Sequence, residues 1–329
     1  MIVLESDHVH NHYRPALQEW DLAEFTKTFR IDIIRVSPMA MEFDVVGTDA
    51  PIANALRRIL IAEIPTMAIE NVFMTNNTSV IHDEVLAHRL GLIPLKVDPS
   101  QFQWKGDADP TDLNTIVFKL NIRCEANPEW KEGDPVENRL INDRVLSSDL
   151  QWEPQGGQAE RFSESPIKTV HDNILVAKLR PGQEIIGELH CEKGIGRDHA
   201  KFSPVATAFY RMMPVIAIKE DITGADADKF ARCFTPGVIE VVKEKGKYRV
   251  RKARVADARK CTMSREALRH KEFQGKVALM HDPRHFLFSI ESTGAMTAPE
   301  LFLLSIKQLV QKCQVVKTAL DKLTDEAES

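Results

Sequence analysis

The chain has 329 residues, of which 43% are hydrophobic and 28% are charged, and its formal net charge is -5 at pH 7. A chain of this length can bury a sizeable core and is expected to form about two domains. The negative charge argues against a protein that wraps nucleic acid by itself, because such proteins cluster Lys and Arg against phosphates.

The five cysteines are scattered and form no C-x-x-C pair, which favours reduced thiols in an intracellular protein. The sequence has no apolar run long enough to cross a bilayer and does not open with a signal peptide pattern. We therefore expect a protein that is not secreted and does not contact a membrane.

Residues 1–24 show no sustained periodicity and are expected to form a flexible N-terminal arm. Three alternating histidines in this arm would share one side of an extended chain: His8, His10 and His12. We expect no metal site there, because the arm supplies no rigid frame for the ligands. Next, two alternating segments between residues 29 and 47 flank Ser37-Pro38 and predict a β-hairpin.

The segment after the hairpin predicts a well-delimited amphipathic helix. Asp49 is a suitable N-cap, Pro51 fits the first turn, and Pro65 ends the helix. Its apolar face should meet a core: Ile52, Leu56, Ile59 and Leu60. The other face is mixed: Asn54, Arg57, Arg58 and Ile61. Paired guanidinium groups beside an isoleucine favour protein docking, whereas two solvated arginines are the alternative interpretation.

The next part of the chain predicts a strand, a short helix and a loop-rich insertion. The strand lies near residues 67–72, and the helix covers residues 83–90 and ends at Gly91 as an αL cap. Between about residues 97 and 157 turn signals and Trp, Pro, Asp and Glu are frequent, which is typical of an inserted domain. Four further strands are predicted, at residues 116–124, 173–179, 183–190 and 205–219.

Two strand pairs follow: residues 238–242 with 248–255 around Lys245-Gly246, and residues 276–280 with 285–291 around Asp282-Pro283. A short helix is expected near residues 264–270. The stretch from Lys243 to Lys271 is strongly basic, so contact with nucleic acid is one interpretation. A charged edge strand that resists aggregation is the more common meaning of such a run.

The last predicted element is a long helix. Thr297, Pro299 and Glu300 supply an N-cap, an early proline and a capping-box acid, and the helix should run to about residue 323. Its apolar residues are spaced as in a coiled-coil seam: Phe302, Ile306, Leu309, Cys313, Val316, Leu320 and Leu323. Two more widen the stripe: Leu303 and Val310. Such a seam needs another helix, either in the same core or in a partner.

Three segments resemble, in this order, the alpha and alpha-like subunits of multisubunit RNA polymerases. They are NALRRIL at residues 54–60, AHRLGLIPL at 87–95 and GIGRDHAKFSPVATAFYR at 194–211. The resemblance implies an α+β fold, in which an alpha-subunit-type dimerisation domain with an antiparallel sheet and two long packed helices is interrupted by a mostly β inserted domain. The implied boundaries are 1–24 for the arm, 25–75 plus 236–329 for the dimerisation domain, and 76–235 for the insertion.

Some members of this family bind zinc or an iron–sulfur cluster through cysteines in the insertion. Between residues 76 and 182 this sequence has only Cys124, so no four-cysteine site and no cofactor is expected. In this respect it resembles most the larger alpha-like subunits shared by RNA polymerases I and III. The magnesium motif D-x-D-G-D and the common nucleotide-binding and hydrolase motifs are absent, so the resemblance implies a non-catalytic subunit.

The resemblance implies a heterodimer with a small alpha-like subunit, on which the second-largest and largest subunits assemble in the nucleus, including the nucleolus. DNA and RNA are then met only through the assembled complex. The implied dimer contacts are Phe302, Ile306, Leu309, Cys313, Val316 and Leu320. Contacts with the large subunits, or a brace for the dimer, are expected from Asn54, Arg57, Arg58 and Ile61.

Two further groups are expected to face partners. His88 and Arg89 are placed in a structured loop, and Asp198, His199 and Lys201 lie in the third motif, where bracing inside the insertion is the alternative role. Two other functions stay open. One is the corresponding subunit of RNA polymerase II or of an archaeal polymerase that has lost its cysteine cluster. The other is a free-standing nucleic-acid-binding protein that acts through the basic stretch.

Overall fold

The computed structural model describes residues 2–6, 9–11, 21–133, 135–243 and 251–328. The chain divides into two compact units. The first comprises Met1–Ile34, Glu42–Asn54 and Phe209–Ser289, and the second comprises Arg35–Met41, Ala55–Ala208 and Ile290–Ser329. Helices and antiparallel strands are mixed, as the predicted α+β class requires. None of the described helices is long and apolar enough to span a membrane.

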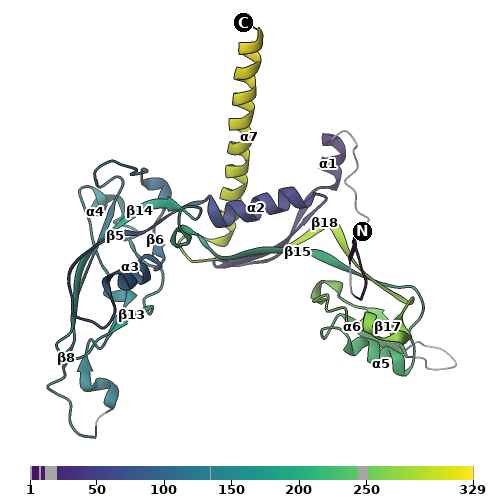
Figure 1. Ribbon diagram of the computed structural model, residues 1–329, viewed down its shortest axis with the longest axis horizontal. Helices are drawn as coiled ribbons and strands as arrows, with labels where there is room; N and C mark the ends of the chain where they lie inside the picture. Colours follow the sequence, from purple (N-terminus) through teal and green to yellow (C-terminus); the bar gives the residue numbers. More distant parts are fainter. Residues whose placement is uncertain (1, 7–8, 12–20, 134, 244–250, 329) are drawn as a thin grey trace. The chain divides into compact units, whose positions relative to one another are not determined.

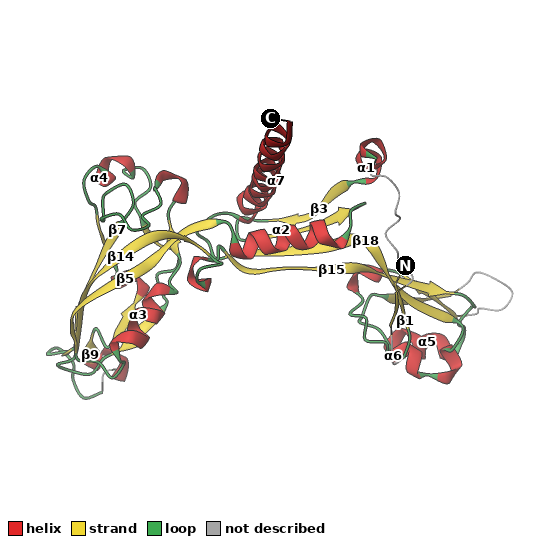
Figure 2. Ribbon diagram, turned by 45° about the horizontal axis from the view of Figure 1, so that its top comes forward, coloured by secondary structure: helices red, strands yellow, loops and turns green. Residues whose placement is uncertain are grey.

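A six-stranded sheet contributes most of its strand residues to the first unit (Figure 2). Its order is β2-β1-β18-β4-β3, with β15 also paired to β18. The strands are β1 (Ile2–Leu4), β2 (Val9–Asn11), β3 (Arg30–Val36), β4 (Ala40–Val46), β15 (Val205–Ile218) and β18 (Val277–Ser292). Phe43 and Phe288 stack in its core with ring centroids 5.1 Å apart, and the Tyr210 ring lies 5.2 Å from that of Phe288. The predicted β3–β4 hairpin is confirmed.

The turn predicted at Asp282-Pro283 is wrong, because β18 continues through both residues. The fixed φ of proline is compatible with extended backbone, and its missing N–H matters only where a ladder bond is required. Pro283 is buried, and Asp282 Oδ1 accepts a hydrogen bond from the backbone N–H of Arg284 at 3.0 Å. The side chain therefore satisfies a donor next to the interruption, and the strand is preserved.

The N-terminal segment departs from the expected arm, because β1 pairs in register with β18 and with β2. Strands of three residues are too short to show a periodicity, so the sequence gives no sign of them. Helix α1 (Leu22–Thr28) follows, with Asp21 as its N-cap. His8 and His12 lie outside the described residues, so the three-histidine arrangement cannot be followed there.

The rest of the first unit packs around Phe230 and Phe273. It consists of α5 (Ala225–Arg232), β16 (Ile239–Lys243), β17 (Arg251–Val255), η5 (Ala258–Lys260), α6 (Glu266–Arg269) and η6 (Lys271–Phe273). Strands β16 and β17 are antiparallel, as predicted, whereas the Lys245-Gly246 turn lies outside the described residues.

The second unit is built on a four-stranded sheet in the order β11-β7-β14-β5. These strands are β5 (Pro65–Asn77), β7 (Ile116–Arg123), β11 (Gln151–Glu153) and β14 (Glu184–Ile195). Helix α3 (Asp83–Gly91) lies beside β5 (Figure 1), and its Leu86 and Leu90 side chains are fully buried. The predicted strands at 67–72, 116–124 and 183–190 are confirmed.

Short elements complete the second unit. Three two-stranded pairs are present: β6 (Leu95–Lys96) with β12 (Lys168–Thr169), β10 (Arg144–Leu146) with β13 (Leu175–Lys178), and β8 (Glu125–Ala126) with β9 (Leu140–Ile141). The short helices are η1 (Pro99–Gln101), η2 (Val136–Arg139), η3 (Ser147–Asp149), α4 (Gln158–Arg161) and η4 (Ala200–Phe202). The sparse regular structure between residues 97 and 157 agrees with the predicted loop-rich composition.

The two helices that the sequence marked most clearly are confirmed. Helix α2 covers Ala50–Ala62, directly after Asp49, and β5 begins at Pro65. Helix α7 covers Ala298–Glu328. Its capping box is formed, because Glu300 Oε2 accepts from the backbone N–H of Thr297 at 2.9 Å and Thr297 Oγ1 accepts from the N–H of Glu300 at 3.4 Å.

Candidate functional site

Helix α7 carries an apolar stripe that its own chain covers only in the first part. Phe302 is buried, Ile306 and Leu309 are half-buried, and every side chain from residue 310 to 323 is exposed. Large apolar side chains in this exposed part are Val310, Val315, Val316, Leu320 and Leu323, and Cys313 lies among them. Contiguous exposed apolar surface on a single chain usually marks an interface, so the second half of α7 is the first candidate.

The predicted seam thus stays on one face of α7, but its residues are buried at the start of the helix and exposed further along. Residues spaced alternately three and four apart lie on the same side of a helix, so Phe302 and Val316 belong to one stripe. Val316 is 59% exposed and Leu323 is 62% exposed, whereas Phe302 is 6% exposed. A helix in a second chain could therefore continue the packing that this chain begins.

The outward face of α2 is the second candidate. Arg58 is exposed and makes no side-chain hydrogen bond or ion pair within the described part of the chain, while Asn54, Arg57 and Ile61 are half-buried. Leu56, Ile59 and Leu60 form the buried side, as predicted. The core position predicted for Ile52 is wrong: its side chain is 43% exposed, because Ala53 fills the buried stripe in the first turn.

The third motif packs against the end of α2, which carries the first motif. A Cβ added to Gly196 would lie 2.2 Å from the carbonyl O of Ile61, and the backbone N–H of Arg197 donates to the carbonyl O of Ala62 at 2.9 Å. The third motif therefore packs directly on the last turn of α2. Its second glycine is required by this close approach and not by an unusual φ.

The second and third motifs meet around Lys201. The Lys201 ammonium donates to the carbonyl O of Ile69 at 2.9 Å and lies 2.6 Å from Glu70 Oε2. The rings of His88 and His199 are in edge contact, with centroids 5.8 Å apart. A Cβ on Gly91 would lie 3.4 Å from Lys201 Cδ. Lys201 therefore holds β5 and the segment after β14 together, and this brace reaches residues before position 76 instead of lying inside the predicted insertion.

Two predicted details of the second motif are wrong. His88 and Arg89 lie in the last turn of α3 and not in a loop, and Gly91 belongs to the helix without a positive φ. Gly91 is needed because a Cβ would come within 3.3 Å of the carbonyl O of Ile69. The Arg89 guanidinium donates to the carbonyl oxygens of Leu175 and Val176 at 2.7 and 2.9 Å, so it ties α3 to β13.

Asp198 is exposed, and its carboxylate makes no hydrogen bond or ion pair among the described residues. Together with Arg58, His88 and His199, it is one of the predicted site residues that still present a polar group to solvent. The structure does not gather the predicted set at one point. It distributes the set over α2, α3, the loop after β14 and α7.

Within the described residues 251–271 of the basic stretch, most cations pair with carboxylates of their own unit. Arg251 pairs with Asp228, Lys252 Nζ lies 2.8 Å from Asp221, and Arg254 Nε lies 2.7 Å from Glu240. The Arg259 guanidinium pairs with the buried Asp44 at 2.6 Å. Cations that already bond carboxylates are poor phosphate ligands, so this geometry gives little support to the nucleic-acid-binding alternative. No cluster of three metal-ligating side chains occurs among the residues that the structure describes.

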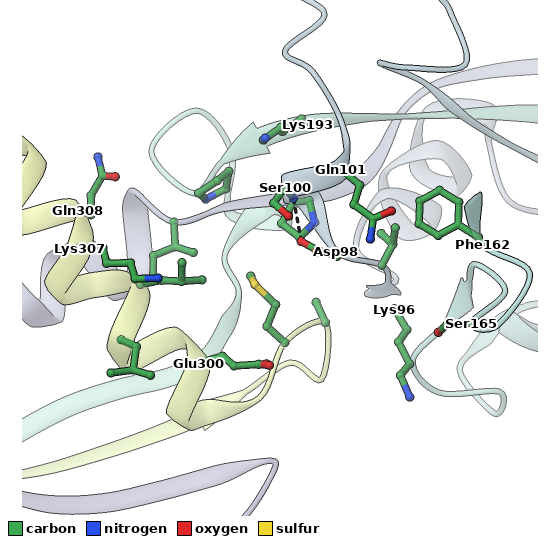
Figure 3. A pocket seen from close by; sticks show the side chains of 18 of the residues that line it. Lys96, Asp98, Ser100, Gln101, Phe162, Ser165, Lys193, Glu300, Lys307 and Gln308 are labelled. Carbon is green, nitrogen blue, oxygen red and sulfur yellow. Dashed lines mark hydrogen bonds between the residues drawn. The ribbon is translucent and has the colours of Figure 1, made fainter. Parts of the chain in front are cut away.

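A groove was missed by sequence reasoning (Figure 3). A cavity of about 790 Å³ lies beside the first turns of α7 and is lined by residues from β6, η1 and β14 and by Phe162 and Ser165. Its residues come from segments far apart in the sequence, so no local sequence pattern predicts the groove. Asp98 Oδ1 accepts from the backbone N–H of Ser100 at 2.8 Å within it.

Comparison with known proteins agrees with this arrangement. Residues 42–313 match the family described as the RNA polymerase Rpb3/Rpb11 dimerisation domain. The RNA polymerases I and III subunit RPAC1 of Homo sapiens is 48% identical over 305 residues, covering 92% of this chain and 87% of the relative. RPAC1 of Saccharomyces cerevisiae is 46% identical over 310 residues, covering 92% and 91%.

A more distant relative is the RNA polymerases II, IV and V subunit 3 of Arabidopsis thaliana, which is 33% identical over 319 residues and covers 92% of this chain and 94% of its own. Identity is thus higher to the subunits of polymerases I and III than to this one. The family match includes α2, about the first half of α7 and all three motif segments. The chain belongs to the family of RNA polymerase subunits that share the Rpb3/Rpb11 dimerisation domain.

Proposed function

We propose that this chain is the larger alpha-like subunit of RNA polymerases I and III and is itself non-catalytic. In this proposal it forms a heterodimer with a small alpha-like subunit and supports the second-largest and largest subunits. The complex then makes the ribosomal RNA precursor, 5S rRNA and tRNA in the nucleus and nucleolus, and this chain meets DNA and RNA only through that complex.

The single observation that carries the proposal is the exposed apolar second half of α7. Val310, Val316, Leu320 and Leu323 are each more than half exposed, and burial of such side chains yields roughly 1 to 2 kcal/mol each. The same stripe is already packed at Phe302. A partner helix that continues this packing gives a specific reason for the exposed residues.

We further propose that dimerisation belongs to residues 25–75 and 236–329, with residues 76–235 inserted between them. Residues 25–75 contain α2 and residues 236–329 contain α7, and these two helices support the proposal. The ion pair between Lys312 Nζ and Glu63 Oε1, at 2.7 Å, links α7 to the end of α2. Such a pair is consistent with two helices that serve one interface.

For the large subunits we propose a second surface made of the outward face of α2 and the loop after β14. Arg58, Arg197 and Asp198 are exposed charged groups on it. Arg57, Asn54 and Ile61 border Arg58 on the same helical face. His88 and His199, from the second and third motifs, are also exposed. Arg89 and Lys201 instead bond backbone carbonyl oxygens of β13 and β5.

The experiment that tests the assignment is purification of the intact, tagged chain from nuclear extract, followed by mass spectrometry of its partners. We expect a small alpha-like subunit together with the largest subunits of both polymerase I and polymerase III. Recovery of the polymerase II large subunits instead would assign the chain to the other branch. Recovery without any polymerase subunit would overturn the proposal.

A further inference from the structure

Two neighbouring cavities lie along one side of α7. The larger, of about 790 Å³, was described above, and the second has a volume of about 540 Å³. They share four lining residues: Pro65, Lys193, Gln308 and Gln311. They therefore form one continuous surface depression, which we call the α7 groove.

The α7 groove lies on a different face of the helix from the apolar stripe. On α7 it is lined at positions 300, 303, 304, 307, 308 and 311, which share one side of a helix. The stripe runs through positions 302, 306, 309, 313 and 316, about half a turn away. An occupant of the groove would therefore not compete with a helix packed on the stripe.

The lining of the α7 groove is rich in apolar side chains. Pro65, Phe162, Met296, Leu303 and Leu304 all contribute to it. Leu303 is 58% exposed, whereas its neighbours Leu301, Phe302 and Ser305 are buried. An apolar floor of this kind gains free energy when another apolar group covers it.

Charge in the α7 groove is opposite in sign to that of the chain. Its lining contains five cationic and three acidic side chains, an excess of two positive charges, whereas the whole chain has a net charge of -5. The acidic side chains are Glu63, Asp98 and Glu300. Each already bonds its own chain: Glu63 bonds Lys312, Asp98 bonds the N–H of Ser100, and Glu300 caps α7 at Thr297.

The cations are less fully engaged. Lys96, Arg197 and Lys307 make no side-chain hydrogen bond or ion pair within the described ranges of the chain, and all three are exposed. Figure 3 shows Lys307 extending from α7 toward the side of the groove that carries Ser100 and Asp98. Lys193 is held in place, since its Nζ donates to the carbonyl O of Phe102 at 2.9 Å. Burial lowers the pKa of Lys193, so a carboxylate placed beside it would restore its preference for the charged form.

We propose that the α7 groove binds an extended segment of another polypeptide that carries acidic side chains between apolar ones. Apolar side chains of the segment cover Leu303, Leu304 and Met296, and its carboxylates pair with Lys96, Lys307 and Arg197. Charge complementarity selects the sign of the partner, and the apolar floor favours a polypeptide over a nucleic acid. The proposal stands apart from the heterodimer, because the groove and the stripe occupy different faces of α7.

The test places the photo-cross-linker p-benzoyl-phenylalanine at position Leu303 in the full chain and irradiates the complex purified through that chain. We expect mass spectrometry to find a cross-link to a segment of another polypeptide in which Asp and Glu outnumber Lys and Arg. The double variant Lys96→Glu, Lys307→Glu should lower the cross-link yield about tenfold, which corresponds to roughly 1.4 kcal/mol. The matched variant Lys96→Arg, Lys307→Arg keeps the charge and should retain the yield.

A second cross-linker position, Val316, separates this proposal from the proposed function. It lies on the stripe and should cross-link to the small alpha-like subunit. If Val316 gives that cross-link while Leu303 gives none, or links to nucleic acid or to a basic segment, the groove proposal is overturned and the heterodimer stands. If Leu303 links to an acidic segment while Val316 links to nothing, the heterodimer proposal fails and the groove proposal stands.

Discussion

The ion pair between Lys312 and Glu63 marks the point along α7 where packing against its own chain ends. Before it, Leu309 is half-buried, and after it every described side chain is exposed. Both oxygens of Glu63 lie within 2.8 Å of Lys312 Nζ. The helix is thus held to its unit at this point, and the apolar stripe beyond it remains available to a second chain.

The close approach of Gly196 to α2 predicts that Gly196→Ala destabilises the protein. The new Cβ would lie 2.2 Å from a backbone oxygen, which cannot move as a flexible side chain would. We expect the free energy of unfolding to fall by about 2 to 3 kcal/mol, measured by denaturant titration. Gly157→Ala is the control, since its nearest neighbour would be 3.8 Å away, and it should change the stability little. Equal stability of the two variants would contradict the close contact.

The buried carboxylate of Asp44 predicts a second stability effect. It accepts hydrogen bonds from Arg259 at 2.6 Å and is 2.9 Å from His285 Nε2. Asp44→Asn leaves the guanidinium without its charge partner, and we expect a loss of about 2 to 3 kcal/mol in the free energy of unfolding. The surface pair of Arg254 with Glu240 supplies the comparison, because Glu240→Gln should cost less than about 1 kcal/mol. Similar losses for both variants would rule out a special role for Asp44.

The reactivity of the cysteine thiols with a maleimide tests the proposed heterodimer interface without any mutation. Cys124, Cys191, Cys233 and Cys261 are buried, and burial raises the pKa of each of these thiols, whereas Cys313 is exposed on α7. Since the thiolate is the reactive form, one thiol should react rapidly with a maleimide at pH 7 and five after denaturation. Because the pKa values of the buried thiols are raised, an increase to pH 8.5 should leave them slow to react.

Addition of the small alpha-like subunit should protect Cys313 in this assay. Peptide mapping by mass spectrometry identifies the labelled residue, and the denatured sample controls for reagent activity. Rapid labelling of Cys313 that the partner does not slow would place this part of α7 outside the interface.

A charge reversal at Arg58 tests the surface proposed for the large subunits separately from the heterodimer interface. Arg58→Glu reverses an exposed charge on the outward face of α2 and should weaken recruitment of the large subunits at least about tenfold while the heterodimer still forms. Quantitative mass spectrometry of the purified complex measures both. Arg254→Glu, a reversal at an exposed arginine of the first unit, is the control and should leave recruitment unchanged. Unaltered recruitment by Arg58→Glu would remove α2 from this surface.

Much of the fold follows from local sequence signals. Asp49 and Pro65 delimit α2, and Thr297 with Glu300 fixes the start of α7, because caps and prolines act within one helical turn. The turn expected at Asp282-Pro283 fails, because the Asp282 side chain and the burial of Pro283 keep the strand extended, and neither is visible in a dipeptide.

The candidate site was predictable where it rests on periodicity. Residue spacing predicts the apolar stripe from Phe302 to Leu323. It does not reveal that the chain itself buries the first part of the stripe and leaves the second part exposed. Packing between distant segments decides that difference. For the same reason the bracing roles of Arg89 and Lys201 and the α7 groove became evident only in three dimensions.

The most direct test of the account measures heterodimer formation by the double variant Val316→Asp, Leu323→Asp. Both side chains are about 60% exposed in the single chain, so its thermal unfolding should not change, whereas a substitution at the half-buried Leu309 would disturb the fold itself. Val315→Asp, at an exposed valine of α7 that points away from the Phe302–Leu323 seam, is the matched control. The account predicts that the double variant weakens binding of the small alpha-like subunit at least about 100-fold, roughly 2.7 kcal/mol, while the control binds normally. Unchanged affinity of the correctly folded double variant would contradict it.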